Sequence, residues 1–145
     1  MPSTVVAATR KVAVDSSALV ALFDGSDRHH ARALKFFEGV RADLVTNIAV
    51  LTEVSHLLAF SHGAVSDCLG WVASSFSIDR DTGSDVRLII AIMEKYAELP
   101  ADFADAALVA MCQRMAIDSI ATFDSDFDDY RLSSGKALVN VLSGA

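Results

Sequence analysis

VAVDSSALVALF, residues 12–23, is the stretch that decides the fold. Its first residues are small and apolar without alternation, which predicts a short buried strand over residues 11–15 that ends in Asp15. Helix-forming apolar residues follow at once, so a helix is expected from Ser16 to Phe23. A buried strand that leads directly into a helix is typical of a parallel sheet with helices on both faces. Asp15 then stands at the carboxyl end of a strand, where sites form in such sheets.

The rest of the chain repeats this alternation of short apolar strands and helices. Further strands are expected over residues 43–46, 76–78, 119–123 and 137–142. Helices are expected over residues 28–37, 48–60, 65–75, 85–99 and 102–115. Asp27 is predicted to cap the first of these helices, and Ser61-His62-Gly63 to stop the second. The predicted organisation is a flexible N-terminal arm over residues 1–10 and a single α/β domain over residues 11–145.

The composition excludes a membrane protein and indicates a protein interface. Apolar residues make up 52% of the chain, yet no run approaches the roughly 20 residues that a membrane helix needs. The charges near the N-terminus follow the apolar residues, which is the reverse of a secretory signal. Cys68 and Cys112 are isolated, so we expect them to be buried and reduced in a cytoplasmic protein. The apolar excess predicts buried strands and an interface, with Leu88–Met93 and Trp71 assigned to the core in preference to the interface.

The net charge argues against binding nucleic acid through bulk electrostatics. The chain carries 19 acidic and 12 basic residues, a formal charge of −7. Such a protein attracts a polyanion only locally, or where its acids converge on cations. Whether the carboxylates meet is therefore the main question that the sequence raises.

Four acids lie at strand ends or on apolar helix faces. Asp15 and Asp124 each follow a predicted strand, and each is equally well suited to cap a helix. Glu53 lies on or beside the apolar stripe of its helix, where a carboxylate is costly unless it coordinates a cation or forms a salt bridge. Asp105 lies in a helix that is apolar almost all round; the alternative is a first-turn acid favoured by the helix dipole, with Asp102 as cap.

If these four acids meet, they need a cation, because like charges a few ångströms apart cannot all stay ionised without one. Clusters of oxygen ligands suit Mg²⁺ or Mn²⁺ and not zinc. Asp126 follows Asp124 by two residues and is either a further acid beside the site or a solvated loop residue.

Four segments in this order resemble the PIN domain family. They are VAVDSSALVALF at 12–23, TNIAVLTEV at 46–54, FADAALVA at 103–110 and IATFDSDF at 120–127. The resemblance implies a three-layer α/β/α fold with a short parallel sheet, and hydrolysis of RNA assisted by Mg²⁺ or Mn²⁺. It also implies an acidic quartet that binds the metal and carries catalysis, with three auxiliary residues: Asp15, Glu53, Asp105 and Asp124, then Asp102, Asp126 and Thr122.

At this chain length the resemblance is to the VapC-type toxins of bacterial toxin–antitoxin pairs. It implies a homodimer that a small VapB-like antitoxin silences. The chain departs from that pattern in the run of about ten residues before the first strand. Water activated by a cation would leave 5′-phosphate and 3′-hydroxyl ends, so none of the four histidines is required as an acid or base: His29, His30, His56 and His62.

A local basic strip is the predicted RNA contact. Arg28, Arg32 and Lys35 lie beside His29 and His30, and the alternative is a solvated helix face. The next candidates are Arg10, Lys11 and Arg131.

Two other functions compete with a ribonuclease. Phosphotransfer through Asp15 is disfavoured, because the strand end lacks a second acid and a DxD pattern. A PIN-like module that binds RNA or a protein without cutting is the alternative from a different class.

Overall fold

The computed structural model describes residues 9–99 and 101–143. Its sheet has five strands, all parallel, in the order β3-β2-β1-β4-β5. They are β1 (Lys11–Val14), β2 (Asp43–Asn47), β3 (Ser77–Asp79), β4 (Ser119–Ala121) and β5 (Val139–Asn140). Central β1 pairs Val12 with Leu44 of β2, and Val14 with Ala121 of β4. The predicted short parallel sheet is confirmed, with the segment at 12–23 at its centre.

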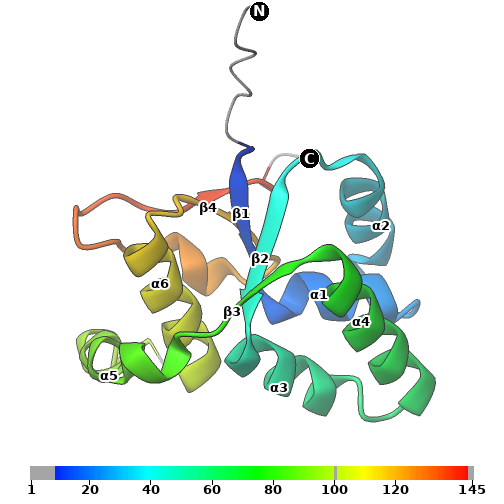
Figure 1. Cartoon of the computed structure of the whole chain (residues 1–145), viewed down its shortest axis with the longest axis horizontal. Helices are drawn as coiled ribbons and strands as arrows, with labels where there is room; N and C mark the ends of the chain where they lie inside the picture. Colours follow the sequence, from blue (N-terminus) through cyan, green and yellow to red (C-terminus); the bar gives the residue numbers. More distant parts are fainter. Residues whose placement is uncertain (1–8, 100, 144–145) are drawn as a thin grey trace, which may run out of the picture.

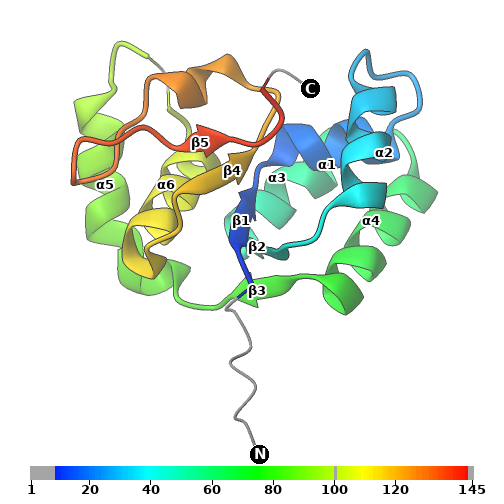
Figure 2. The ribbon, with the colours of Figure 1, turned by 90° about the horizontal axis from the view of Figure 1, so that it is seen from above.

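Six α-helices and two 3₁₀ turns accompany the sheet. They are α1 (Ser16–Phe23), α2 (His30–Gly39), α3 (Ile48–Leu57), α4 (His62–Ser75), α5 (Val86–Lys95) and α6 (Phe103–Met115), with η1 (Thr82–Asp85) and η2 (Ser125–Asp128). Helices α5 and α6 lie on one side of the sheet, and α1, α2 and α4 lie on the other (Figures 1 and 2). Helix α3 starts directly after β2 and contacts both α1 and α6. The predicted three-layer α/β/α arrangement is confirmed, and α3 connects its two outer layers beside the strand ends.

Two predicted helix boundaries were wrong because polar side chains make other local contacts. Asp27 does not cap α2, because its carboxylate accepts the N–H of His29 (2.8 Å) in the turn before the helix begins at His30. Ser61 does not stop α3, which already ends at Leu57; its hydroxyl accepts the N–H of Ala64 (3.2 Å) and caps α4. Helix α4 therefore begins three residues earlier than predicted.

Other predicted elements have the right type and shorter bounds. Helix α3 ends at Leu57, not at residue 60. The helix expected over 85–99 corresponds to α5, which ends at Lys95 and is preceded by η1. The last two strands are β4 and β5, each shorter than predicted.

The core runs on both sides of the sheet and contains most of α6, whose residues 104–112 are all buried. The run Leu88–Met93 is divided: Ile89 and Ile92 belong to the core, whereas Ile90 is 50% exposed. Trp71 is half-buried against phenylalanine rings of α1, α2 and the segment before β3. Cys68 and Cys112 are free and buried, as predicted.

The predicted arm over residues 1–10 falls, up to residue 8, outside the described residues. Arg10 is held by both neighbouring strands. Its carbonyl accepts the N–H of Asp43 (2.8 Å), and its guanidinium donates to Ser119 Oγ (2.6 Å). Within residues 9–99 and 101–143, no helix combines the length and apolar character needed to cross a bilayer.

Candidate functional site

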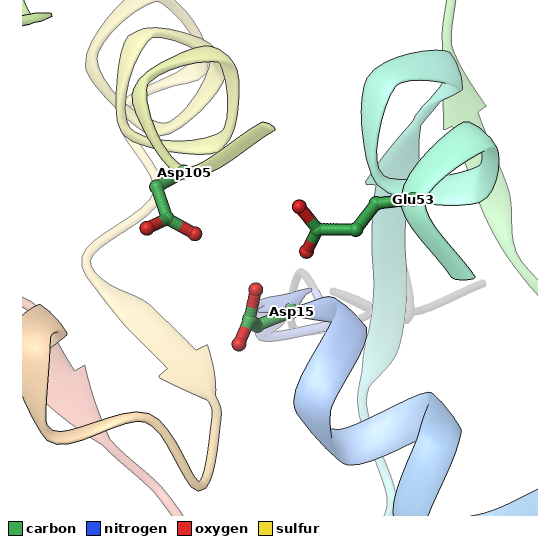
Figure 3. A group of neighbouring side chains, drawn as sticks. All are labelled: Asp15, Glu53 and Asp105. Carbon is green, nitrogen blue, oxygen red and sulfur yellow. The ribbon is translucent and has the colours of Figure 1, made fainter. Parts of the chain in front are cut away.

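Three carboxylates from distant parts of the chain converge at the strand ends. Asp15 follows β1, Glu53 belongs to α3 and Asp105 to α6, and one oxygen of each lies within 4.8 Å of the others. Figure 3 shows the three side chains pointing toward one another. The structure therefore brings together three of the four predicted site acids, across the contact of α3 with α1 and α6.

Asp15 is both the cap of α1 and a member of this group. It is buried, and its Oδ2 accepts the hydroxyls of Ser17 and Thr122, each at 2.8 Å. Burial raises the pKa of Asp15, and these hydroxyl donors partly oppose the rise. Asp15 therefore caps α1, one of the two alternatives that the sequence left open, and also belongs to the group of converging carboxylates.

Glu53 is half-buried, and its carboxylate accepts a hydroxyl group instead of pairing with a cationic side chain. Ser16 Oγ donates to Glu53 Oε1. Burial raises the pKa of Glu53 to about 7, and the nearby carboxylates of Asp102 and Asp15 add to the rise. The ion pairs within the described part of the chain all involve Arg114. The salt bridge considered for Glu53 is thus not among them.

Asp105 is buried, and its pKa is raised well above the ordinary value. It is 7% exposed, and burial followed by the charge of Asp15 raises its pKa to about 8. The hydroxyl of fully buried Tyr130 donates to Asp105 Oδ2 (3.3 Å). Asp102 caps α6 by accepting the N–H of Asp105 (2.8 Å), so the capping interpretation of Asp102 is confirmed.

Asp124 borders the site without joining the group of three. It lines a cleft of about 510 Å³ together with Asp15 and Glu53. Its Oδ1 accepts the N–H of Asp126 (2.9 Å), so Asp124 caps η2. Thr122 connects Asp124 to the group, because its hydroxyl accepts the N–H of Asp124 (2.9 Å) and donates to Asp15.

Asp126 is partly exposed, and the neighbouring charge of Asp124 raises its pKa. Asp126 does not line the cleft, and both alternatives, a further acid near the site and a solvated loop acid, stay open.

Three of the hydroxyl groups that hold the carboxylates were not predicted from the sequence, namely those of Ser16, Ser17 and Tyr130. Ser16 and Ser17 stand directly after Asp15, and that adjacency was a usable signal. Tyr130 gave no signal, because it lies 25 residues from Asp105 and no motif links the two.

The three residues of the predicted basic strip, Arg28, Arg32 and Lys35, do not share one surface site. Arg28 is exposed and lines the carboxylate cleft. Arg32 donates to the carbonyl of Leu142 (2.7 Å), and Lys35 lies farther along α2, beside a separate hollow. Arg131, a reserve candidate, donates to the backbone carbonyl of Asp128 (2.5 Å). Only part of the strip therefore lies at the cleft.

Comparisons with known proteins agree with this fold. The PIN domain family model matches residues 12–132. Among solved structures, VapC20 of Mycobacterium tuberculosis, described as a sarcin-ricin loop cleaving toxin, matches with 21% identity and a TM-score of 0.76 over 81% of this chain and 93% of that chain. FitAcB from Neisseria gonorrhoeae matches with 11% identity and a TM-score of 0.54 over 79% and 88% of the two chains. No curated protein matches the chain. At these identities the two structures support the fold alone.

Proposed function

The chain belongs to the PIN domain family, and from this premise we propose that it is a metal-dependent endoribonuclease, the toxin of a VapBC-type pair in the cytoplasm. The observation that carries the proposal is the convergence of Asp15, Glu53 and Asp105 within 4.8 Å. No lysine or arginine among the described residues forms an ion pair with them. Three neighbouring carboxylates without a cationic side chain are the arrangement that a bound cation stabilises.

The donor set fits Mg²⁺ or Mn²⁺. All three groups present carboxylate oxygens, which hard divalent cations prefer, and neither histidine nor cysteine belongs to the group. The raised pKa values of Glu53 and Asp105 have the same origin, because burial and mutual repulsion disfavour the ionised forms. We assign Asp124 as the fourth ligand-bearing acid at the edge of the cleft, with auxiliary places for Asp102, Asp126 and Thr122.

The chain's own contribution is to hold the carboxylates in place. Ser17 and Thr122 fix Asp15, Ser16 fixes Glu53 and Tyr130 fixes Asp105, all through hydroxyl groups. A bound divalent cation supplies the Lewis acidity for phosphodiester hydrolysis.

The proposal includes RNA, an antitoxin and a second copy as partners. Arg28, Arg32 and Lys35 are the proposed RNA contacts, with Arg28 nearest to the carboxylates. A VapB-like antitoxin and a homodimer would cover exposed apolar side chains, such as Phe60 (68% exposed) and Ile90. Sedimentation at micromolar concentration should give about twice the chain mass, and a monomer that needs no partner to stay in solution would contradict both interfaces.

RNA cleavage with matched variants tests the activity. The wild-type protein should cut single-stranded RNA with Mg²⁺ or Mn²⁺ and not with EDTA. Asp15→Asn and Asp105→Asn should each lower the rate by roughly 100-fold or more while the fold is kept, because each removes one ligand charge at little change in volume. Asp67→Asn, an exposed acid of α4, is the control and should cleave as the wild type does.

The controls separate the two candidate functions. Cleavage by Asp15→Asn at the wild-type rate, in a preparation free of other nucleases, would refute the assignment. A wild-type protein that binds RNA and Mn²⁺ without cutting would instead support the non-catalytic module.

A further inference from the structure

Two aromatic rings stack at the mouth of the carboxylate cleft. His29, just before α2, and Phe123, between Thr122 and Asp124, have ring centroids 4.3 Å apart and planes within 1° of parallel. Both residues are half-buried, so the stack lies at the surface and not in the core. The N–H of Phe123 donates to Ser17 Oγ (2.9 Å), the hydroxyl that also donates to Asp15. The stack is therefore fixed to the same hydrogen-bond network as the carboxylates.

Two arginines flank the stack. The Arg32 guanidinium lies over the Phe123 ring, 5.2 Å from its centroid, and is held there by the carbonyl of Leu142. Arg28 Nε donates to His29 Nε2 (3.1 Å). In a chain with a net charge of −7, two guanidinium groups beside one aromatic pair form a local cationic site.

The stack separates two hollows. On one side is the carboxylate cleft of about 510 Å³, which His29 and Phe123 both line. On the other side is a hollow of about 210 Å³, lined by the same two rings and by Arg28, Arg32 and Asn140. Asp124 and Asp128 also border this second hollow, so phosphate binding there depends on the arginines. A polymer with one phosphate at the carboxylates would pass over the stack to reach the second hollow.

We propose that the His29–Phe123 stack is a nucleobase-binding platform that holds the nucleotide next to the scissile phosphate, with Arg28 and Arg32 as contacts for the adjoining phosphate. This inference rests on the proposed ribonuclease function and adds a base-binding subsite to it. Every base has a flat face, so stacking on an aromatic ring binds single-stranded RNA without requiring one sequence. The guanidinium groups supply the charge that phosphate requires. Single-stranded RNA is thus the substrate form that this site selects.

A fluorescent oligonucleotide tests the platform independently of cleavage. The probe is a single-stranded hexaribonucleotide with one 2-aminopurine, measured with Ca²⁺ in place of Mg²⁺, and separately with EDTA. Its fluorescence should fall on binding to the wild type, because 2-aminopurine is quenched when it stacks. His29→Ala should weaken binding by about five- to tenfold and abolish the quenching. His29→Phe, which keeps a stacking ring, should retain both.

Further variants control for structural damage. His62→Ala, an exposed histidine of α4, should bind the probe as the wild type does. Phe123→Leu keeps apolar volume without the aromatic face and should lose the quenching. Mn²⁺ affinity, measured by calorimetry, should be unchanged in His29→Ala, which shows that the carboxylates remain in place.

The outcomes distinguish this inference from the ribonuclease proposal. If His29→Ala and Phe123→Leu quench and bind the probe as the wild type does, the platform is refuted, whether or not RNA is cut. If the wild type quenches the probe and the variants do not, the platform holds even where cleavage is absent. A wild type that binds the probe without quenching would also refute the platform, and the contact would then be to phosphate alone.

Discussion

Two groups of converging acids in the described part of the chain differ in the groups that offset their charge. At the strand ends, Asp15, Glu53 and Asp105 face one another, and the side chains that donate to them are hydroxyls. Near the other end of α6, Arg114 stands among aspartates of β3 and of the segment that follows it. Its guanidinium contacts Asp79 (2.5 Å), Asp85 (2.9 Å) and Asp81 (3.8 Å).

The comparison shows that the role of a buried acid is indicated by the group that contacts it: an arginine at one end of α6 and, among the described residues, no cationic side chain at the other. Arg114 pairs with Asp85 through two nitrogens, and these acids raise the pKa of the guanidinium further. At the strand ends, the carboxyl pKa values rise instead, to about 7 for Glu53 and about 8 for Asp105. The Arg114 group is complete within the chain and connects α6 to β3 and η1. The strand-end group lacks a positive charge, which a bound cation would provide.

Removing the arginine should give the largest change in stability. Arg114→Leu keeps most of the side-chain stem but leaves Asp79 and Asp85, whose side chains are 6% exposed, without a cation. The free energy of unfolding at pH 7 should fall by about 3 kcal/mol, measured by urea denaturation in EDTA. Arg87→Leu, at an exposed position of α5, is the control and should change it by less than about 0.5 kcal/mol. Equal losses in the two variants would mean that the Arg114 group is not structural.

The strand-end acids could be predicted from the sequence, whereas the Arg114 group could not. Asp15 was predictable because the strand before it is short, buried and followed at once by a helix. Asp105 was predictable because a carboxylate in a helix that is apolar almost all round is costly to bury unless it binds a cation or a hydrogen-bond donor. The Arg114 group was not predicted, because its members come from three elements whose contacts depend on how η1 and α6 pack. Asp124 follows a strand as predicted, but the η2 turn directs one of its oxygens toward the N–H of Asp126.

The hydroxyl partners depend on tertiary packing in the same way. Thr122 was predicted as auxiliary from the resemblance alone, and the structure shows it between Asp15 and Asp124. Tyr130 reaches Asp105 only because it packs among the rings of Tyr96 and Phe127. The local sequence pattern thus predicts which acids lie at the strand ends. Side-chain packing determines which groups donate hydrogen bonds to them.

The metal-free protein should lose stability as pH rises, because of the strand-end group. The pKa values of Glu53 and Asp105 in the folded state are about 7 and about 8, above the ordinary values of 4.5 and 3.8. Between these limits the folded state holds more protons than the unfolded state, so the stability is present at low pH and is lost as pH rises. From about pH 5 to about pH 8, the free energy of unfolding in EDTA should fall on the order of 2 kcal/mol, which is less than these pKa values alone would give because solvent screens the partly exposed carboxylates.

Matched Asp→Asn variants assign that pH dependence to its group. Asp105→Asn should flatten the curve and be more stable than the wild type at pH 8, because repulsion is relieved. Asp85→Asn should be less stable at every pH in this range, because it weakens the pairing with Arg114. Two variants with the same chemical change are thus expected to have opposite signs. A wild-type stability that is constant or rises from pH 5 to pH 8 would contradict the charge assignment.

The smallest expected effect comes from removing the Ser16 hydroxyl, which contacts the strand-end carboxylates. Ser16 Oγ donates to Glu53 and lies 3.5 Å from Asp15 Oδ1, so it positions two of the three carboxylates. Ser16→Ala should lower Mn²⁺ affinity by about tenfold, roughly 1.4 kcal/mol, because Glu53 loses the donor that orients it. Calorimetric titration measures the affinity, and urea denaturation in EDTA should show a change below about 1 kcal/mol. Ser84→Ala, at an exposed position of η1 beside the Arg114 group, is the matched control and should leave Mn²⁺ binding unchanged. Wild-type affinity in Ser16→Ala would reduce Ser16 to an ordinary helix residue, and Glu53 would then be oriented by its own helix alone.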